Sequence, residues 1–332
     1  MLLALLLVNL PTLAAQNNVP EGFPLTIVDA SGQELTFDEP PHRVICYYTG
    51  CIEALVALGM RPIAVPEWFD QFPNLTLQNT PDGMADVEII PVNDGVPSPE
   101  VVAALQPDLV MTDADGVAAL AGIAPAFDTY RLNSLDDVIS NLRRYAELLN
   151  RETEAETMIA AFEARLGAYA RLTPDDLTVM SIGVDMGDPT YRDFLFVRST
   201  NSPDCEILNL VAQCPWELPP SSDSWWSSFP ANFEYLMEKD PDVILTSSIY
   251  YPDPDEVRQT IYSDPVWSQL SAVENARYIL APDDLSADGI VAATRFVDIV
   301  IPAIYPDIFP DGPLTDEQVQ EILAEANEEA SE

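Results

Sequence analysis

Short, uninterrupted apolar runs alternate along the chain with longer segments in which apolar residues recur every three or four positions. Such short runs are typical of strands buried on both faces, and the periodic segments are typical of amphipathic helices. Strands are expected at residues 43–46, 62–65, 109–112, 177–182, 243–245 and 278–280, and a small hairpin at 25–37. Helices are expected over 52–58, 206–212 and 290–304. Because helices separate the strands, the strands are expected to form parallel βαβ units.

One segment of the chain recurs in its second half. Residues 100–112 read EVVAALQPDLVMT, and residues 234–246 read EYLMEKDPDVILT. In both copies a glutamate opens a short helix, a proline ends it because proline has no backbone N–H, and an aspartate leads into an apolar strand. The repeat predicts two lobes of like construction, each with a hydrophobic core of its own.

A long helical segment is expected between the two copies. Ser134 and Asp137 resemble a capping box, and apolar residues then recur at helical spacing from Ile139 to Tyr169. The predicted fold class is α/β, with two lobes, each a mostly parallel sheet flanked by helices, joined by one long α-helix. The expected domains are a signal peptide (1–18), an N-terminal lobe (24–138), the linking helix (139–172), a C-terminal lobe (173–312) and an acidic tail (313–332) that is either a solvated helix or disordered.

Length and charge narrow the classes of function. The 332 residues suffice for two hydrophobic cores, and 55 acidic against 14 basic residues give a net charge of −41. Nucleic acids are therefore excluded as partners, and an anionic membrane would also repel this surface, so membrane association is expected only through a transporter. The acidity is interpreted as a solvated shell that aids solubility, as in a saline habitat.

The N-terminus and the cysteines indicate export. Met1 to Leu10 is almost wholly apolar and small residues follow it, which predicts a secretory signal and a periplasmic or extracellular protein. The four cysteines form two close pairs, and an even set in an exported protein favours disulfides. The pair Cys205–Cys214 is favoured, as a bridge that closes a short surface loop. The pair Cys46–Cys51, at the end of a strand and the start of a helix, is a second candidate whose geometry the sequence leaves open.

Two segments carry a resemblance to a known family. PHRVICYYTGCIEALVALG (41–59) and SPEVVAALQPDLV (98–110) resemble the helical-backbone periplasmic binding proteins, which serve ABC importers of ferric siderophores, haem and cobalamin. The resemblance covers residues 24–312. It implies a monomer whose two lobes, bridged by one long helix, make only a small hinge movement. It also implies that Glu100 and Glu234, one on each lobe, dock onto arginines of a permease dimer that works with a cytoplasmic ATPase.

Aromatic residues follow several of the predicted strands, where ligands bind in open parallel sheets. The candidate ligand-binding residues are Tyr47, Tyr48, Trp68, Tyr191, Arg192, Arg198, Trp225, Trp226, Tyr250 and Tyr251. Aromatic rings suit a large, partly apolar ligand, and a ferric siderophore, which brings its own Fe³⁺, is the expected one. Many ferric siderophores are anionic, so Arg192 and Arg198 are the candidates for a charge clamp.

Several alternatives stay open at this point. Haem or cobalamin could replace the siderophore, and haem would need a tyrosine ligand such as Tyr47. The single histidine, His42, is interpreted as structural, so no metal is expected to bind the protein directly. A sensory or adhesion module of the same fold is a further reading. The last alternative is an enzyme that uses Asp113 and Asp115 as an acid/base pair. No nucleophile elbow or phosphate-binding loop accompanies them, so the protein is expected not to be an enzyme.

Overall fold

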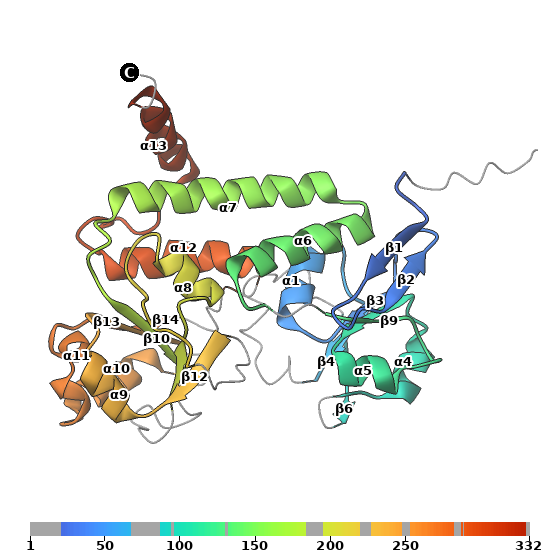
Figure 1. Ribbon diagram of the computed structural model, residues 1–332, viewed down its shortest axis with the longest axis horizontal. Coiled ribbons are helices and arrows are strands. Elements are labelled where there is room, and N and C mark those ends of the chain that lie inside the picture. The colour runs from blue at the N-terminus through green and yellow to red at the C-terminus, as the bar shows by residue number, and fades with distance from the viewer. Residues whose placement is uncertain are drawn as a thin grey trace, which may run out of the picture.

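The computed structural model describes residues 21–67, 87–93, 96–129, 132–183, 195–219, 227–247, 253–281, 287 and 289–329. These residues form two five-stranded sheets, one in each half of the chain, and a layer of helices spans both (Figure 1). The two-lobed α/β architecture predicted from the sequence pattern is confirmed. The expected signal peptide lies outside the described residues.

The sheet of the N-terminal lobe is parallel throughout, in the order β5-β4-β3-β8-β9. Its strands are β3 (Val44–Cys46), β4 (Ala64–Pro66), β5 (Glu88–Ile90), β8 (Leu109–Thr112) and β9 (Ala126–Asp128). Every residue of β3 and β8 is buried, as expected of apolar runs between two layers. The helices of this lobe include α1 (Thr49–Ala57), α4 (Pro99–Leu105) and α5 (Ala114–Ala119). Two hairpins complete it, β1 (Leu25–Val28) with β2 (Glu34–Phe37) and β6 (Val92–Asn93) with β7 (Val96–Pro97).

The sheet of the C-terminal lobe is mixed, in the order β12-β11-β10-β13-β14. Its strands are β10 (Val179–Gly183), β11 (Leu195–Arg198), β12 (Ser228–Ala231), β13 (Val243–Ser247) and β14 (Tyr278–Ala281). The strands β10, β13 and β14 are parallel, whereas β11 and β12 run antiparallel to their neighbours. The sequence pattern did not predict the two antiparallel strands, because each alternates buried and less buried positions instead of forming an apolar run. The helices α9 (Phe233–Lys239), α10 (Pro254–Ser263) and α11 (Ser271–Glu274) belong to this lobe.

The repeated segment has the same backbone turn in both lobes. Helix α4 ends at Gln106 (φ 48°) and helix α9 at Asp240 (φ 41°), both in the left-handed region, and a proline follows each. The residue before a proline is restricted away from the right-handed helical region, so each helix ends there. The predicted role of the two prolines as helix ends is therefore confirmed.

The repeated aspartate ties two strands together in each lobe. Asp108 accepts hydrogen bonds from the backbone N–H groups of His42 (2.7 Å) and Arg43 (2.8 Å), just before β3. Asp242 accepts from the backbone N–H (2.9 Å) and the hydroxyl (2.7 Å) of Thr178, just before β10. Each aspartate thus connects the start of a central strand to the start of its neighbour.

Two helices, not one, form the segment between the lobes. Helix α6 (Leu135–Leu149) ends at Asn150, which is left-handed (φ 56°), and helix α7 begins at Glu152. Asparagine tolerates this conformation better than most residues, which permits a sharp reversal. The expected continuous helix over 139–172 is therefore divided, and α7 (Glu152–Leu172) packs against α6 and spans the two lobes (Figure 1).

The start of α6 is tied to the C-terminal lobe. The hydroxyl of Ser134 accepts a hydrogen bond from the backbone N–H of Asp137 (3.1 Å), which confirms the predicted cap. Glu206, on α8 (Pro203–Leu208), accepts from the backbone N–H of Leu135 at 2.6 Å. Burial of the Glu206 carboxyl is the largest influence on its pKa and raises it above its usual value. This bond joins the linking helices to α8 across a separation of 71 residues.

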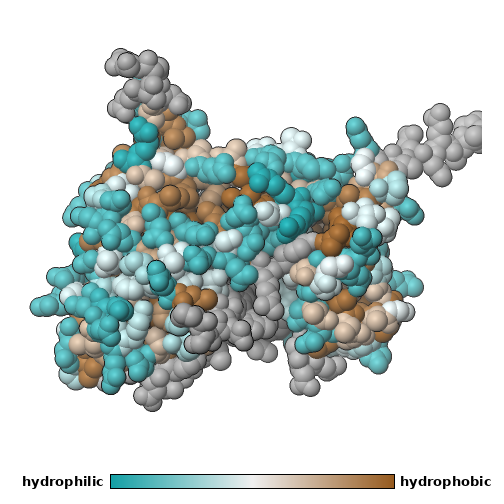
Figure 2. All heavy atoms as spheres, viewed as in Figure 1, coloured by the Kyte–Doolittle hydropathy of each residue, from teal (hydrophilic) through white to brown (hydrophobic). Residues whose placement is uncertain are grey.

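The hydrophobic core is shared between the lobes, which corrects the expectation of two separate cores. One cluster extends from Val44 and Leu55 in the N-terminal lobe, through Phe162 and Phe296, to Val243 in the C-terminal lobe. Helix α12 (Ile290–Ile304) packs against both α1 and α7 and so closes the gap between the halves. Figure 2 shows hydrophobic residues gathered between α7 and α12 on a face that is otherwise largely hydrophilic.

The acidic tail forms helix α13 (Asp316–Glu329), which projects from the body and is anchored at its start (Figure 1). Arg165 of α7 donates to Asp298 (2.8 Å) and to the carbonyl oxygen of Leu314 (2.7 Å), and pairs with Asp316. The hydroxyl of Tyr169 donates to Asp298 (3.2 Å) and accepts from the N–H of Leu314 (2.9 Å). The tail therefore begins as an ordered element on the linking helix.

Candidate functional site

The residues that follow β3 and β8 meet at the carboxyl edge of the N-terminal sheet, because these strands pair in parallel. The phenol of Tyr48 donates a hydrogen bond to Oδ2 of Asp113 at 2.7 Å. Oδ1 of Asp113 accepts from the backbone N–H of Gly116 at 2.8 Å, so the same carboxylate caps α5. Both oxygens of Asp113 are thus engaged, one by the helix and one by Tyr48.

The surroundings of Tyr48 keep its phenol protonated. Burial is the largest cause that raises its pKa, followed by the hydrogen bond and charge of Asp113, with further contributions from Asp128 and Asp115. All the charged groups that raise this pKa are carboxylates. Tyr48 therefore acts as a neutral donor toward Asp113 and not as a phenolate.

Tyr47 is placed differently from its neighbour. Its side chain is only 2% exposed and packs in the smaller hydrophobic cluster of the N-terminal lobe with Ile45 and Val110. Its hydroxyl has no hydrogen-bond partner within the described part of the chain, and burial raises its pKa. Of the two tyrosines that follow β3, Tyr48 is the one that keeps some exposure.

A disulfide encloses both tyrosines. Cys46 ends β3, Cys51 lies in the first turn of α1, and their bridge spans a Cα–Cα distance of 6.3 Å. Both cysteines are buried. The bridge therefore ties together the strand end and the helix start on either side of Tyr48.

Arg198 lies in the C-terminal lobe, at the end of β11, and is paired with a buried acid. Its Nε is 3.3 Å from Oδ2 of Asp204, whose side chain is 5% exposed. Oδ1 of Asp204 accepts from the backbone N–H of Ala287 at 2.9 Å. Because β11 runs antiparallel to β10, Arg198 lies level with Ser228 of β12 and not beyond the carboxyl ends of the parallel strands. Much of the charge of Arg198 is therefore balanced within the protein.

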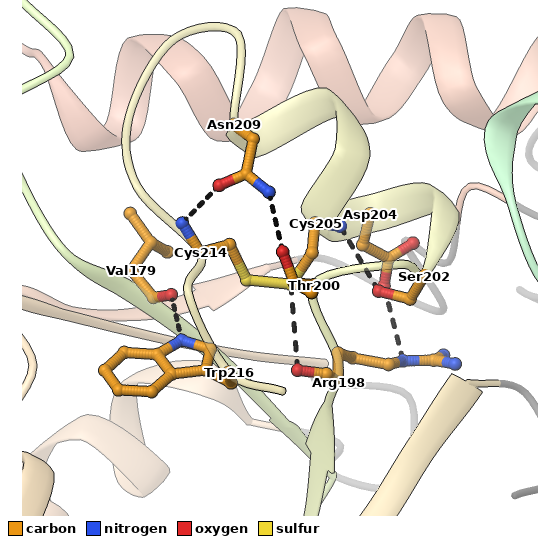
Figure 3. Close-up of a disulfide and its surroundings, with 9 residues drawn as sticks. All are labelled: Val179, Arg198, Thr200, Ser202, Asp204, Cys205, Asn209, Cys214 and Trp216. Atoms are coloured by element: carbon orange, nitrogen blue, oxygen red, sulfur yellow. Dashed lines mark hydrogen bonds and ion pairs between the residues drawn. A yellow bond between two sulfur atoms is a disulfide. The ribbon is translucent and has the colours of Figure 1, made fainter. Parts of the chain in front are cut away.

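The second disulfide, Cys205–Cys214, is present with a Cα–Cα distance of 5.3 Å (Figure 3). Both cysteines are fully buried, while Asn209, Leu210 and Gln213 of the loop that they close are exposed, as expected of a surface loop. Asn209 accepts from the N–H of Cys214 (2.7 Å), and the indole of Trp216 donates to the carbonyl oxygen of Val179 (2.7 Å). The bridge thus fixes the chain after α8 beneath the helical layer.

The other candidate ligand-binding residues all lie outside the described residues: Trp68, Tyr191, Arg192, Trp225, Trp226, Tyr250 and Tyr251. In the sequence, Trp68 follows β4, Tyr191 and Arg192 follow β10, and Tyr250 and Tyr251 follow β13.

Glu100 and Glu234 occupy matching positions in the two lobes. Each lies in the first turn of its repeat helix, α4 or α9, and each is exposed. The hydroxyl of Ser98 donates to Glu100 at 3.2 Å. Figure 1 places both helices on the side of their lobes away from α7.

His42 and Asp115, which were also considered from the sequence, both lie at the surface. His42 is exposed and its backbone N–H is held by Asp108, while Asp115 is exposed in the first turn of α5. Among the described residues, no group of three or more His, Cys, Asp or Glu side chains is arranged to hold a metal ion. None of the helices in the described ranges has the length and apolar character needed to cross a membrane.

The sequence reasoning did not identify Asp113 as the partner of Tyr48 or Asp204 as the partner of Arg198. Asp113 was considered as a catalytic acid and was not linked to Tyr48. Its position directly after β8 was a usable signal, because residues after adjacent parallel strands converge. Nothing in the sequence distinguishes Asp204 among 55 acidic residues.

Comparison with known proteins supports one family. The family model described as periplasmic binding protein matches residues 44–285. A Bacillus subtilis protein provisionally named an ABC transporter substrate-binding lipoprotein, YhfQ, is 27% identical over 71% of this chain and 75% of its own length. The Fe(3+)-citrate-binding protein YfmC of the same organism is 23% identical over 75% of this chain and 76% of its own length. The Fe3+-Desferal-bound siderophore-binding protein FhuD of Vibrio cholerae has a similar fold, with a TM-score of 0.65 at 20% identity over 79% of this chain and 97% of that one.

Proposed function

This chain belongs to the periplasmic binding protein family, and we propose that it captures a ferric siderophore between its lobes and delivers it to the permease of an ABC importer. The family and fold are those of substrate-binding proteins and not of enzymes. The observation that carries the proposal is the pair of matching lobes, each with strands whose carboxyl ends lead into aromatic-containing segments. Two proteins similar to this one are named for binding Fe³⁺ chelates, which supports the ligand class.

The proposed ligand contacts come from both lobes. Tyr48 serves the N-terminal lobe, whereas Tyr47 is buried in its core and is not a proposed contact. Arg198 is not one either, because it is paired with Asp204 away from the carboxyl ends of the parallel strands. In the sequence, Trp68, Arg192, Tyr250 and Tyr251 follow strands, and Trp225 and Trp226 lie in the polar segment before β12; these are the remaining proposed contacts. Rings at these places would cover a bulky chelate at low cost in conformational entropy. The iron arrives already coordinated by the siderophore, so the protein itself supplies no metal ligands.

Ligand binding can be tested by tryptophan fluorescence. The purified chain is titrated with a panel of ferric siderophores, ferric citrate, haem and cobalamin, and each metal-free siderophore serves as the control. Saturable quenching by a ferric siderophore is the expected result. Quenching by haem or cobalamin alone would replace the ligand, and no quenching by any member would refute the proposed capture function.

We further propose that Glu100 and Glu234 are the contacts with the permease and that the protein works outside the cytoplasm as a monomer. The two glutamates give each lobe one exposed carboxylate, which suits bidentate pairing with arginine. The double variant Glu100→Ala/Glu234→Ala should bind the chelate as well as the wild type but fail to support siderophore-dependent growth. The matched control is Glu34→Ala/Glu256→Ala, which removes an exposed acid from another element of each lobe. Equal growth of the two double variants would contradict the docking role.

A further inference from the structure

The direction of one hydrogen bond determines which groups of a ligand can hydrogen-bond to Tyr48. A phenol has a single hydrogen, and Tyr48 donates it to Asp113 at 2.7 Å. What remains on the phenol oxygen is acceptor capacity. Because Tyr48 is partly exposed at the carboxyl edge of the N-terminal sheet, a ligand group that reaches this oxygen has to be a donor.

The fold holds Asp113 in the position in which it accepts this hydrogen bond. Its other oxygen is engaged by the backbone N–H of Gly116, as the cap of α5, so the side chain is held in one orientation. On the other side, the Cys46–Cys51 bridge restrains the segment that carries Tyr48. The acceptor state of Tyr48 is thus built into the fold on both sides of the hydrogen bond.

The nearby charges favour the same kind of ligand group. Asp113, Asp115 and Asp128 all act on Tyr48, and each carboxylate attracts a cation or a polarised N–H and repels an anionic oxygen. Arg198, in the C-terminal lobe, is paired with Asp204. The described surroundings of Tyr48 therefore disfavour catecholate or carboxylate oxygens at this position.

We propose that Tyr48 is a specificity-determining acceptor, positioned by Asp113, and that the ligand presents an ammonium group to it. The inference rests on the proposed function and narrows its ligand to ferric chelates that carry a cationic group, as hydroxamates with a free amine do. Ferric tricatecholates and ferric citrate, which present anionic oxygens, bind more weakly.

The test compares two chelates that differ at one group. Ferrioxamine B carries a free ammonium, and its N-acetylated form has the same iron-binding hydroxamates without that charge. The wild type should bind ferrioxamine B about tenfold more tightly in fluorescence or calorimetric titrations, the effect of one charge-assisted hydrogen bond. Equal affinities for the two chelates would overturn the inference without any variant.

Asp113→Asn reverses the hydrogen bond while keeping the helix cap. The amide oxygen still accepts from Gly116, the amide N–H₂ donates to the Tyr48 oxygen, and the phenol hydrogen turns outward. The tenfold preference for ferrioxamine B should disappear or invert. The matched control Asp115→Asn removes the same charge two residues away, outside the hydrogen bond, and should change the preference by less than about threefold.

The outcomes separate the inference from the function on which it rests. If the two variants change the preference alike, the effect is one of charge alone and the acceptor role of Tyr48 is wrong. If only ferric citrate or a tricatecholate binds, the capture function stands and this inference falls. If no ferric chelate binds, both fall. Circular dichroism melting of each variant checks that it is folded, and a folding defect would weaken both chelates equally and leave their ratio unchanged.

Discussion

Arg165→Met should destabilise the protein by removing the cation that anchors helix α13 to α7. The Arg165 and Asp298 side chains are 13% and 26% exposed, and Nη1 of Arg165 lies 2.8 Å from Oδ1 of Asp298. The same Nη1 donates to the carbonyl oxygen of Leu314 at 2.7 Å. Methionine keeps most of the apolar stem, so the substitution chiefly removes the charge and the hydrogen bonds.

The magnitude follows from burial. Removing one partner of a fully buried ion pair costs about 3–5 kcal/mol, because an uncompensated charge is left behind. Asp298 retains some exposure, and the Tyr169 hydroxyl continues to donate to it, so part of that cost is relieved. We therefore expect Arg165→Met to lower the free energy of unfolding by about 2–3 kcal/mol.

The matched control is Arg143→Met, on the neighbouring helix. Nε of Arg143 lies 2.7 Å from Oε1 of Glu156, but the two side chains are 49% and 55% exposed. Exposed pairs of this kind contribute little, so the control should unfold close to the wild type. Urea denaturation followed by circular dichroism measures both variants. Equal losses for Arg165→Met and Arg143→Met would refute the argument that burial decides the outcome.

The pH dependence gives a second check on the same prediction. Burial raises the pKa of Asp298 above its usual value, and the Arg165 guanidinium opposes that rise. A carboxyl group whose pKa is higher in the folded state binds more protons there, so its ionisation lowers stability as the pH rises through that pKa. Without Arg165 the pKa should rise further. The deficit of Arg165→Met should consequently be larger at pH 7 than near pH 5, and a deficit that grows on acidification would contradict this sign.

Three further predictions concern the frame of the molecule. Asp242→Ala should lower the free energy of unfolding by about 1–2 kcal/mol, because its two hydrogen bonds to Thr178 are partly buried, and Asp108→Ala should lower it by less, because water can replace the exposed bonds to His42 and Arg43; a larger loss for Asp108→Ala in urea titrations would contradict this. Glu206→Gln keeps an acceptor for the Leu135 N–H but cannot ionise. Ionisation of Glu206, whose pKa is raised in the folded state, lowers stability as the pH rises, and this fall should be absent from the melting profile of the variant; an unchanged profile would contradict this. The double variant Cys205→Ser/Cys214→Ser should lose about 2–3 kcal/mol of stability through the freed loop, measured by denaturation without reductant, and an unchanged midpoint would show that the bridge constrains nothing.

Apolar runs predicted the elements whose bounds depend on burial alone. The strand at 109–112 and the helix at 290–304 were predicted with the bounds that the structure has, because each is a predominantly apolar segment that becomes buried. The cap at Ser134 was predicted because its hydrogen bond spans only three residues. Asn150 was missed, since the apolar periodicity on either side continues and only its left-handed backbone ends the helix.

The candidate site depended more on long-range placement. Sequence position put Tyr47 and Tyr48 together after a strand, but only packing decided that Tyr47 is buried in the core cluster while Tyr48 reaches Asp113, 65 residues away. Arg198 was chosen because bases are scarce, and its pairing with Asp204 depends on how α8 folds back on β11. Such contacts join elements whose separation in sequence carries no periodic signal.

The sequence by itself determined which segments are buried, where the repeat places its prolines and aspartates, and that the chain forms two similar α/β lobes. Those features follow from local backbone restrictions and from the tendency of apolar side chains to leave water. Only the tertiary structure decided that α1, α7 and α12 share one core and that Tyr48 offers an acceptor at the edge of the N-terminal sheet. The direction of a hydrogen bond depends on which partner packing brings within about 3 Å, and residue types along a chain do not specify that distance.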